Sequence, residues 1–266
     1  MSSEGNGVGG HEQTSSEAVI RVHADAGALA DAVAGEIVAA AREAAAAGRK
    51  LCVALSGGST PKRLYERLAE APHAGRMPWE ALDIFWGDER CVPPEHADSN
   101  YRMTASALLD RVPIPKTAIH RLRGESDPAA EAARYESEIR RVVPRGPSGM
   151  PRFDLVLLGM GDDGHTASLF PGQTLAPSGP LCGVARHPQT ATRRVSFTLG
   201  LINAAASVSF LVTGGAKAEL VRAIVARDPI AERWPAAQVR PGDGDVVWHL
   251  DREAGARLDR GEGRGS

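Results

Sequence analysis

Short apolar runs alternate along this chain with segments of helical pattern, and glycine-rich turns follow several of those runs. The runs that predict strands are 18–22, 51–55, 82–86, 153–158, 194–199, 208–212 and 246–250. Helices are expected over 25–47, 60–70, 99–109, 128–143 and 215–226. Strands separated by helices favour an α/β fold with a mostly parallel sheet and helices on both faces, in three layers. Such folds bind ligands beyond the carboxyl ends of their strands, so the glycine turns are the first candidates for a site.

No break in composition divides the 266 residues, which predicts one domain over 18–255 with flexible tails at 1–17 and 256–266. The N-terminus lacks the basic start and apolar run of a signal peptide, and no apolar stretch reaches the ~20 residues of a membrane span. A net charge of −2 gives no reason to expect nucleic acid or a membrane as partner. Three scattered cysteines argue against disulfides or structural zinc. We expect a cytoplasmic monomer.

The first glycine-rich turn follows the strand at 51–55 and consists of Ser56, Gly57, Gly58, Ser59 and Thr60. Glycines permit close backbone approach, hydroxyls donate hydrogen bonds, and a helix N-terminus offers unpaired N–H groups to an anion. The alternative is an ordinary tight turn in which Thr60 caps the helix. Two glycines beside three hydroxyls favour phosphate binding, although the turn lacks the Gly-Lys-Ser/Thr of a nucleotide-binding P-loop.

A second candidate segment is Asp88-Glu89-Arg90, directly after the strand at 82–86. Acids at a strand end serve as bases or hold sugar hydroxyls, and we expect Asp88 and Arg90 to contact the substrate. A solvated loop with a local ion pair is the equal alternative on these residues alone.

The third segment, at 159–164, matches Gly-x-Gly-x-x-Gly after a strand. A dinucleotide-binding unit needs an acidic residue about 20 positions later, but no Asp or Glu occurs between His165 and Ala218. Asp163 instead precedes His165 on a sharp turn, where a carboxylate can hold one imidazole nitrogen and leave the other as a base. A lone histidine is more often structural, but this placement favours catalysis. With only Asp162 and Asp163 nearby, we expect no metal and no cofactor.

The acid-free stretch after His165 is basic and contains Arg194 and Lys217. Lys217 follows a strand and a glycine turn, where a lysine is a suitable point charge for phosphate. A solvated basic surface is the alternative. Together with the turn at 56–60, these residues predict a small phosphorylated ligand.

With these segments in view, the chain closely resembles the 6-phosphogluconolactonase family. The shared stretches are SGGSTP at 56–61, FWGDER at 85–90, SNYRM at 99–103, GMGDDGHTASLFP at 159–171, RVSFTL at 194–199 and TGGAKA at 213–218. The resemblance implies a sugar-phosphate-isomerase-like, Rossmann-like fold and cofactor-free hydrolysis of 6-phosphoglucono-1,5-lactone in the oxidative pentose phosphate pathway. It also implies that His165 is the base and that Arg194 and Lys217 hold the phosphate. Gly200 departs from the family's frequent proline.

Two other functions remain to be weighed. An amino-sugar-phosphate deaminase or isomerase of the same fold would carry a glutamate soon after the histidine, where this chain has Ser168-Leu169-Phe170-Pro171. A non-catalytic sugar-phosphate sensor would need the phosphate turns but not the pair of Asp163 and His165. Both alternatives are disfavoured on these grounds.

Overall fold

Six parallel strands form the central sheet of the computed structural model, which describes residues 18–173 and 179–258. Their order across the sheet is β1-β9-β8-β5-β2-β3. The strands are β1 (Val19–His23), β2 (Leu51–Leu55), β3 (Leu82–Trp86), β5 (Leu155–Leu158), β8 (Ser207–Val212) and β9 (Asp245–Asp251). The order reverses beside β5, so the strand ends that carry the expected glycine turns lie next to one another.

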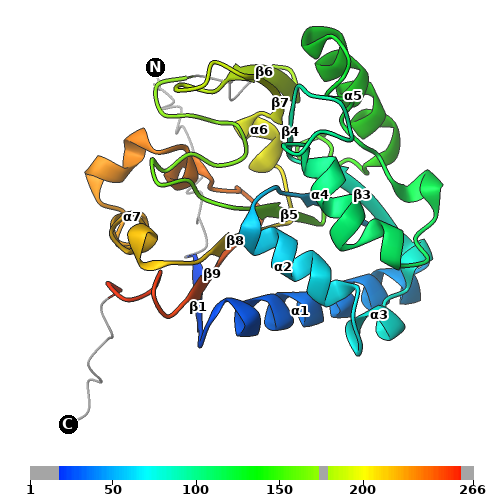
Figure 1. The fold of residues 1–266 in the computed structure, drawn as a ribbon, viewed down its shortest axis with the longest axis horizontal. Helices are drawn as coiled ribbons and strands as arrows, with labels where there is room; N and C mark the ends of the chain where they lie inside the picture. The colour runs from blue at the N-terminus through cyan, green and yellow to red at the C-terminus, as the bar shows by residue number, and fades with distance from the viewer. Residues whose placement is uncertain (1–17, 174–178, 259–266) are drawn as a thin grey trace, which may run out of the picture.

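Helices cover both faces of this sheet, as the alternating pattern predicted. Figure 1 shows α1, α2 and α3 on one side of it and α7 on the other. The helices are α1 (Ala26–Ala46), α2 (Ser59–Leu68), α3 (His73–Arg76), α4 (Asn100–Ala107), α5 (Pro128–Val142), α6 (Leu199–Ile202) and α7 (Ala218–Val225). Short 3₁₀ turns lie at η1 (Trp79–Ala81), η2 (Leu109–Arg111), η3 (Lys116–Ala118), η4 (Gly215–Lys217), η5 (Pro229–Arg233) and η6 (Pro235–Gln238). The predicted α/β fold class is confirmed.

A second, antiparallel sheet of three strands was not expected. It consists of β4 (Asp88–Arg90), β7 (Arg193–Phe197) and β6 (Cys182–Arg186), with β7 in the middle. The strand predicted at 194–199 therefore lies outside the parallel sheet, and it ends early because Thr198 caps α6. Helix α5 packs against β6 and β7. The short β4 joins this sheet directly to β3, so the two sheets meet at the end of β3.

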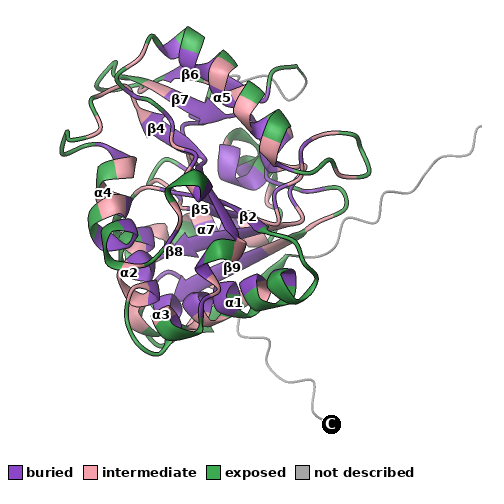
Figure 2. Cartoon of the chain, turned by 90° about the vertical axis from the view of Figure 1, so that its right-hand side faces the viewer, coloured by how far each residue is buried: buried purple, intermediate pink, exposed green. Residues whose placement is uncertain are grey.

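The core forms where α1 packs on the parallel sheet. Asp25 caps α1 by accepting hydrogen bonds from the backbone of Gly27 and Ala28, both at 2.8 Å. Leu29, Val33 and Ile37 recur at helical spacing and are buried. All five residues of β2 and of β3 are buried as well, and Figure 2 shows the purple strands enclosed between helices. Within the described residues, no helix is long and apolar enough to cross a membrane.

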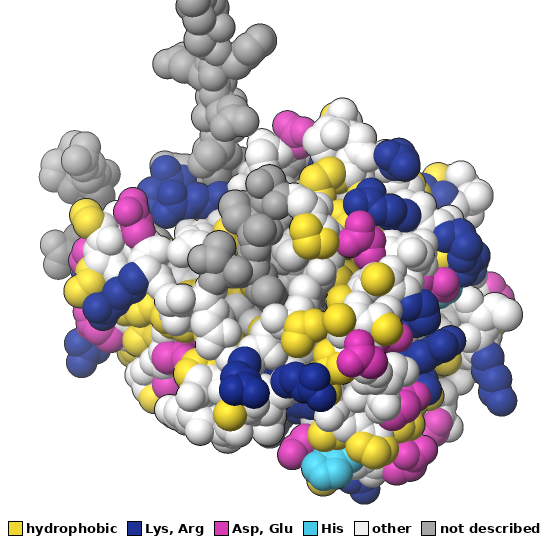
Figure 3. Space-filling model, turned by 90° about the horizontal axis from the view of Figure 1, so that it is seen from above, with side chains coloured by type: hydrophobic (Ala, Val, Ile, Leu, Met, Phe, Trp, Pro, Cys, Tyr) yellow, Lys and Arg dark blue, Asp and Glu magenta, His cyan; other side chains and the backbone are white. Residues whose placement is uncertain are grey.

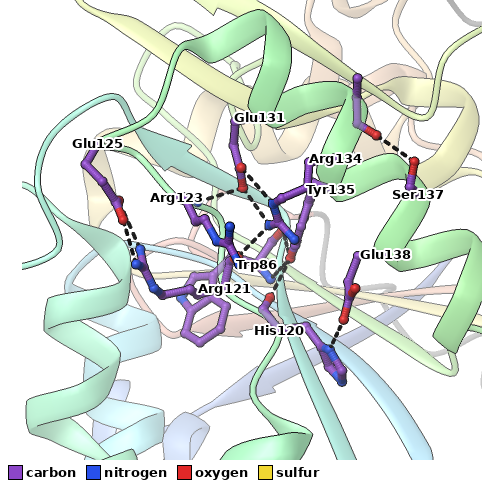
Figure 4. Close-up of polar contacts among 11 residues, drawn as sticks. Trp86, His120, Arg121, Arg123, Glu125, Glu131, Arg134, Tyr135, Ser137 and Glu138 are labelled. Atoms are coloured by element: carbon purple, nitrogen blue, oxygen red, sulfur yellow. Dashed lines mark hydrogen bonds and ion pairs between the residues drawn. The ribbon is translucent and has the colours of Figure 1, made fainter.

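A buried tyrosine on α5 fixes the end of β3. The hydroxyl of Tyr135 accepts a hydrogen bond from the Trp86 N–H at 2.8 Å and lies 3.0 Å from the carbonyl oxygen of His120 (Figure 4). Beside it, the carboxylate of the buried Glu131 accepts two hydrogen bonds from Arg134. Because Trp86 is the last residue of β3, this anchor sets where the following residues of β4 begin.

Two helix starts differ from the sequence expectations. Helix α2 starts at Ser59 with Gly58 at its N-cap, so Thr60 lies inside the first turn and does not cap it. Gly58 adopts φ +106°, which a threonine avoids. The helix expected over 215–226 opens as the 3₁₀ turn η4 before α7. The tail predicted at 1–17 lies outside the described residues, as does all of the C-terminal tail beyond 258.

Candidate active site

A cavity of about 260 Å³ lies at the carboxyl ends of β2, β5 and β8. Ten of the residues singled out in the sequence line it: Ser56, Gly57, Gly58, Ser59, Thr60, Asp88, Arg90, His165, Arg194 and Lys217. Ser56 and Lys217 are 161 positions apart in the sequence, and the meeting of strand ends at one edge of the sheet brings them together. Asp163 does not line the cavity but lies behind the ring of His165.

The turn that carries His165 is closed by its own backbone. The Gly161 N–H donates to the His165 carbonyl at 2.9 Å, and the Gly164 N–H donates to the Gly161 carbonyl at 3.1 Å. A Cβ on Gly161 would lie 2.1 Å from His165 Nδ1. Gly164 has φ +79°, and a Cβ there would lie 2.5 Å from the Trp234 side chain. Gly161 therefore makes room for the histidine ring and Gly164 for Trp234, which is a different role from admitting a dinucleotide.

Asp163 orients the imidazole of His165. Its Oδ1 lies 2.6 Å from Nδ1 and also accepts a hydrogen bond from the His165 backbone N–H at 3.1 Å. Partial burial raises the pKa of Asp163, but these bonds from His165 outweigh it and lower the pKa below its usual value. The ionised carboxylate then accepts a hydrogen bond from Nδ1–H, which leaves the lone pair on Nε2 free to take a proton.

The glycine turn before α2 presents backbone N–H groups to the cavity. Helix α2 has no side-chain cap at its N-terminus, so the N–H groups of its first turn are available to a ligand. Gly57 must be glycine because a Cβ would lie 2.0 Å from Asn100 Oδ1. The hydroxyls of Thr60 and Thr213 lie 2.8 Å apart and join this turn to the one before Lys217.

Three cations line the cavity with few counter-ions. Lys217 Nζ contacts the carboxylate of Asp162, and Arg194 lies 3.9 Å from the carboxylate of Asp88. The buried Nε atoms of Arg90 and Arg194 find no hydrogen-bond partner among the described residues. Burial and repulsion from Arg90 lower the pKa of Arg194, although Asp88 opposes them. Buried positive charge of this kind favours an anionic ligand.

Asp88 and Glu89 are both buried in β4, which overturns the solvated-loop alternative. Glu89 accepts the backbone N–H groups of Asn100 and Tyr101, both at 2.7 Å, and so caps α4. Its burial raises its pKa despite these bonds. Asp88 points the other way, where it accepts a hydrogen bond from Ser168 Oγ at 2.7 Å. Asp88 is therefore the acid that faces the cavity, and Glu89 is structural.

Sequence reasoning assigned no role to Asn100 or Ser168. Asn100 Nδ2 donates to the Asp88 carbonyl at 2.9 Å, and Asn100 Oδ1 lies against the Gly57 turn. Both residues belong to the stretches shared with the family. A polar residue at the start of a helix, such as Asn100, or shortly after a turn, such as Ser168, nevertheless has no distinctive pattern in the sequence around it. Their contacts span 12 and 80 positions, so only the fold reveals them.

Neither a cluster of metal ligands among the described residues nor a surface patch of a single charge sign on the face shown in Figure 3 accompanies the cavity. Among residues 18–173 and 179–258, no group of three or more His, Cys, Asp or Glu side chains is placed to hold a metal ion. On the face shown in Figure 3, basic and acidic side chains are interspersed. A small ligand in the cavity meets the cations Arg90, Arg194 and Lys217 together with the carboxylate of Asp88.

Comparisons with known proteins give consistent results. A sequence model described as glucosamine-6-phosphate isomerases/6-phosphogluconolactonase matches residues 24–248. The 6-phosphogluconolactonase of Haemophilus influenzae is 42% identical over 76% of this chain and 85% of its own, and that of Treponema pallidum is 48% identical over 68% and 74%. The solved structure of 6-phosphogluconolactonase from Trypanosoma brucei has a TM-score of 0.82 and 31% identity, covering 91% of this chain and 99% of its own.

Proposed function

The chain belongs to the glucosamine-6-phosphate isomerase/6-phosphogluconolactonase family, and on that premise we propose that its cavity hydrolyses 6-phosphoglucono-1,5-lactone to 6-phosphogluconate. The family alone includes isomerases and deaminases as well as lactonases. The activity is favoured because curated relatives at 40–48% identity are named 6-phosphogluconolactonase. The enzyme is accordingly a carboxylic ester hydrolase of carbohydrate metabolism.

The observation that carries the proposal is the placement of an imidazole held by a carboxylate in a cavity that three cations line. His165 supplies a base, and Arg194, Lys217 and the N-terminus of α2 supply positive potential for a phosphate. A phosphorylated lactone needs both features, since it carries a dianion at one end and an electrophilic carbonyl at the other.

The chemistry requires only one activated water. His165 Nε2 takes a proton from that water as it attacks the lactone carbonyl, which forms a tetrahedral oxyanion. Collapse of this intermediate breaks the bond to the ring oxygen, and the imidazolium returns its proton to that oxygen. Such general acid–base catalysis is typically worth about 10²–10⁴-fold in rate. Asp163 acts by stabilising the imidazolium and holding its tautomer.

The phosphate contacts position the substrate for this step. Lys217, Arg194 and the backbone of the 56–60 turn would anchor the phosphate, and Asp88 and Arg90 would contact the sugar. Fixing the carbonyl against His165 turns binding energy into rate.

The test is a proton-release assay with freshly generated 6-phosphogluconolactone, corrected for spontaneous hydrolysis. Saturable acceleration with formation of 6-phosphogluconate is the expected result. Hydrolysis at the spontaneous rate at micromolar enzyme would refute the proposal.

Two further properties belong to the same proposal. We expect a cytoplasmic enzyme, because Cys52, Cys91 and Cys182 are all free thiols, as is usual for proteins of a reducing compartment. We also expect a monomer. Light scattering coupled to size exclusion reports the mass in solution, and a value near twice 28.0 kDa would overturn the monomer.

A further inference from the structure

Lys217 has an internal counter-ion that is not part of the cavity wall. Its Nζ contacts Oδ1 of Asp162, the residue before Asp163. The side chain of Lys217 is 18% exposed, whereas that of Asp162 is 80% exposed. Lys217 lines the cavity and Asp162 is not among the lining residues. Lys217 is therefore a cavity residue whose ammonium group is paired with the carboxylate of Asp162, a solvent-exposed residue outside the cavity lining.

The turn at 161–164 directs two adjacent carboxylates to different partners. Asp163 holds the His165 ring, and Asp162 holds Lys217. The backbone of the turn is fixed by the hydrogen bond from Gly161 N–H to the His165 carbonyl. Asp162 has no second described partner, so its side chain can rotate into water without moving the backbone that carries His165.

We propose that Asp162 competes with the phosphate of the ligand for Lys217. In the free enzyme the Asp162 carboxylate pairs with the Lys217 ammonium group, and it rotates into solvent when a phosphate binds there. This inference rests on the phosphate assignment of the proposed function. The phosphate wins because it also meets Arg194 and the N-terminus of α2, while the exposed Asp162 loses little on returning to water.

The competition weakens every phosphate-bearing ligand to the same extent. An ion pair with an exposed partner shifts an equilibrium by about one-and-a-half- to fivefold. The affinities for the substrate, for the product 6-phosphogluconate and for inorganic phosphate are all reduced by this same factor. Asp162 therefore leaves the choice among them unchanged, but it lowers the occupancy of the site by product and free phosphate. An unphosphorylated lactone does not use Lys217 and bears no penalty.

The variant Asp162→Asn tests this directly because it keeps the shape of the side chain and removes its charge. The expected result is a fall of about one-and-a-half- to fivefold in the KM for 6-phosphogluconolactone. Calorimetric Kd values for 6-phosphogluconate and for inorganic phosphate should fall by the same factor. The KM and kcat for unphosphorylated gluconolactone should stay unchanged, which shows that the His165 turn is intact.

Two control variants separate the pairing from general charge effects. Asp162→Glu keeps the negative charge and should retain constants close to those of the wild type. Asp110→Asn removes one exposed carboxylate from η2, outside the residues lining the cavity, and should change none of the constants.

Unchanged or weaker binding of phosphate ligands by Asp162→Asn would overturn the inference while the wild type remains an active lactonase. A wild type that neither binds 6-phosphogluconate nor hydrolyses the lactone overturns the proposed function, and this inference with it. The two failures are therefore distinguishable in the same set of measurements.

Discussion

Replacing Lys217 with methionine removes one charge from the cavity and keeps most of the side-chain volume. The Lys217 side chain is largely shielded from water, with 18% exposed, so its charge-assisted hydrogen bond to a phosphate should be worth roughly 1.5–3 kcal/mol. Giving up the contact with Asp162 on ligand binding returns about 0.2–1 kcal/mol of that. The net expectation is a loss of about two- to a hundredfold in kcat/KM for 6-phosphogluconolactone.

The assay compares phosphorylated and unphosphorylated gluconolactone with the same enzyme preparations. Lys217→Met should lower kcat/KM for the phosphorylated lactone strongly and that for gluconolactone little, because only the first presents an anion to Lys217. Lys116→Met is a matched control, since Lys116 is exposed on η3 and does not line this cavity. An equal loss on both lactones would show that Lys217 does not hold the phosphate.

Three further predictions follow from particular contacts. Gly57→Ala forces Asn100 away from Asp88, so it should lower activity and reduce the free energy of unfolding in urea by about 1–3 kcal/mol. The control Gly75→Ala has open space around its Cβ position and should change neither quantity. Activity should survive EDTA; loss that a divalent ion restores would show a metal requirement. Burial lowers the pKa of His249 to about 4 from 6.5, so between these values only the unfolded chain gains the proton. Stability should fall by roughly 2 kcal/mol from pH 7 to 5 through this residue, and by correspondingly less in His249→Gln.

The parallel sheet and its helices could be predicted because most of its strands are short, largely buried apolar runs. Residues 51–55 and 82–86 are such runs, and their boundaries match β2 and β3. The antiparallel sheet could not be predicted. Its strand β4 has three residues, of which Asp88 and Glu89 are acids buried by contacts far along the chain. A local pattern cannot report such burial.

The candidate site was predicted where chemistry follows from neighbours in sequence. Asp163 and His165 are two positions apart, so a turn suffices to join them. Asn100 was missed because its partners, Asp88 and Gly57, are reached only by folding. The contact between Asp162 and Lys217 spans 55 positions, and adjacent aspartates in sequence do not reveal which one holds the imidazole and which one the lysine.

The most direct test of the account is the proton-release assay on wild-type protein and His165→Ala side by side. His165 lies at the surface of the cavity with 27% of its side chain exposed, so the variant should fold normally, as near-identical thermal unfolding would show. The account predicts that its kcat for 6-phosphogluconolactone falls by about 10²–10⁴-fold while 6-phosphogluconate still binds. An unchanged kcat in a folded His165→Ala variant would contradict the central claim that this histidine is the base.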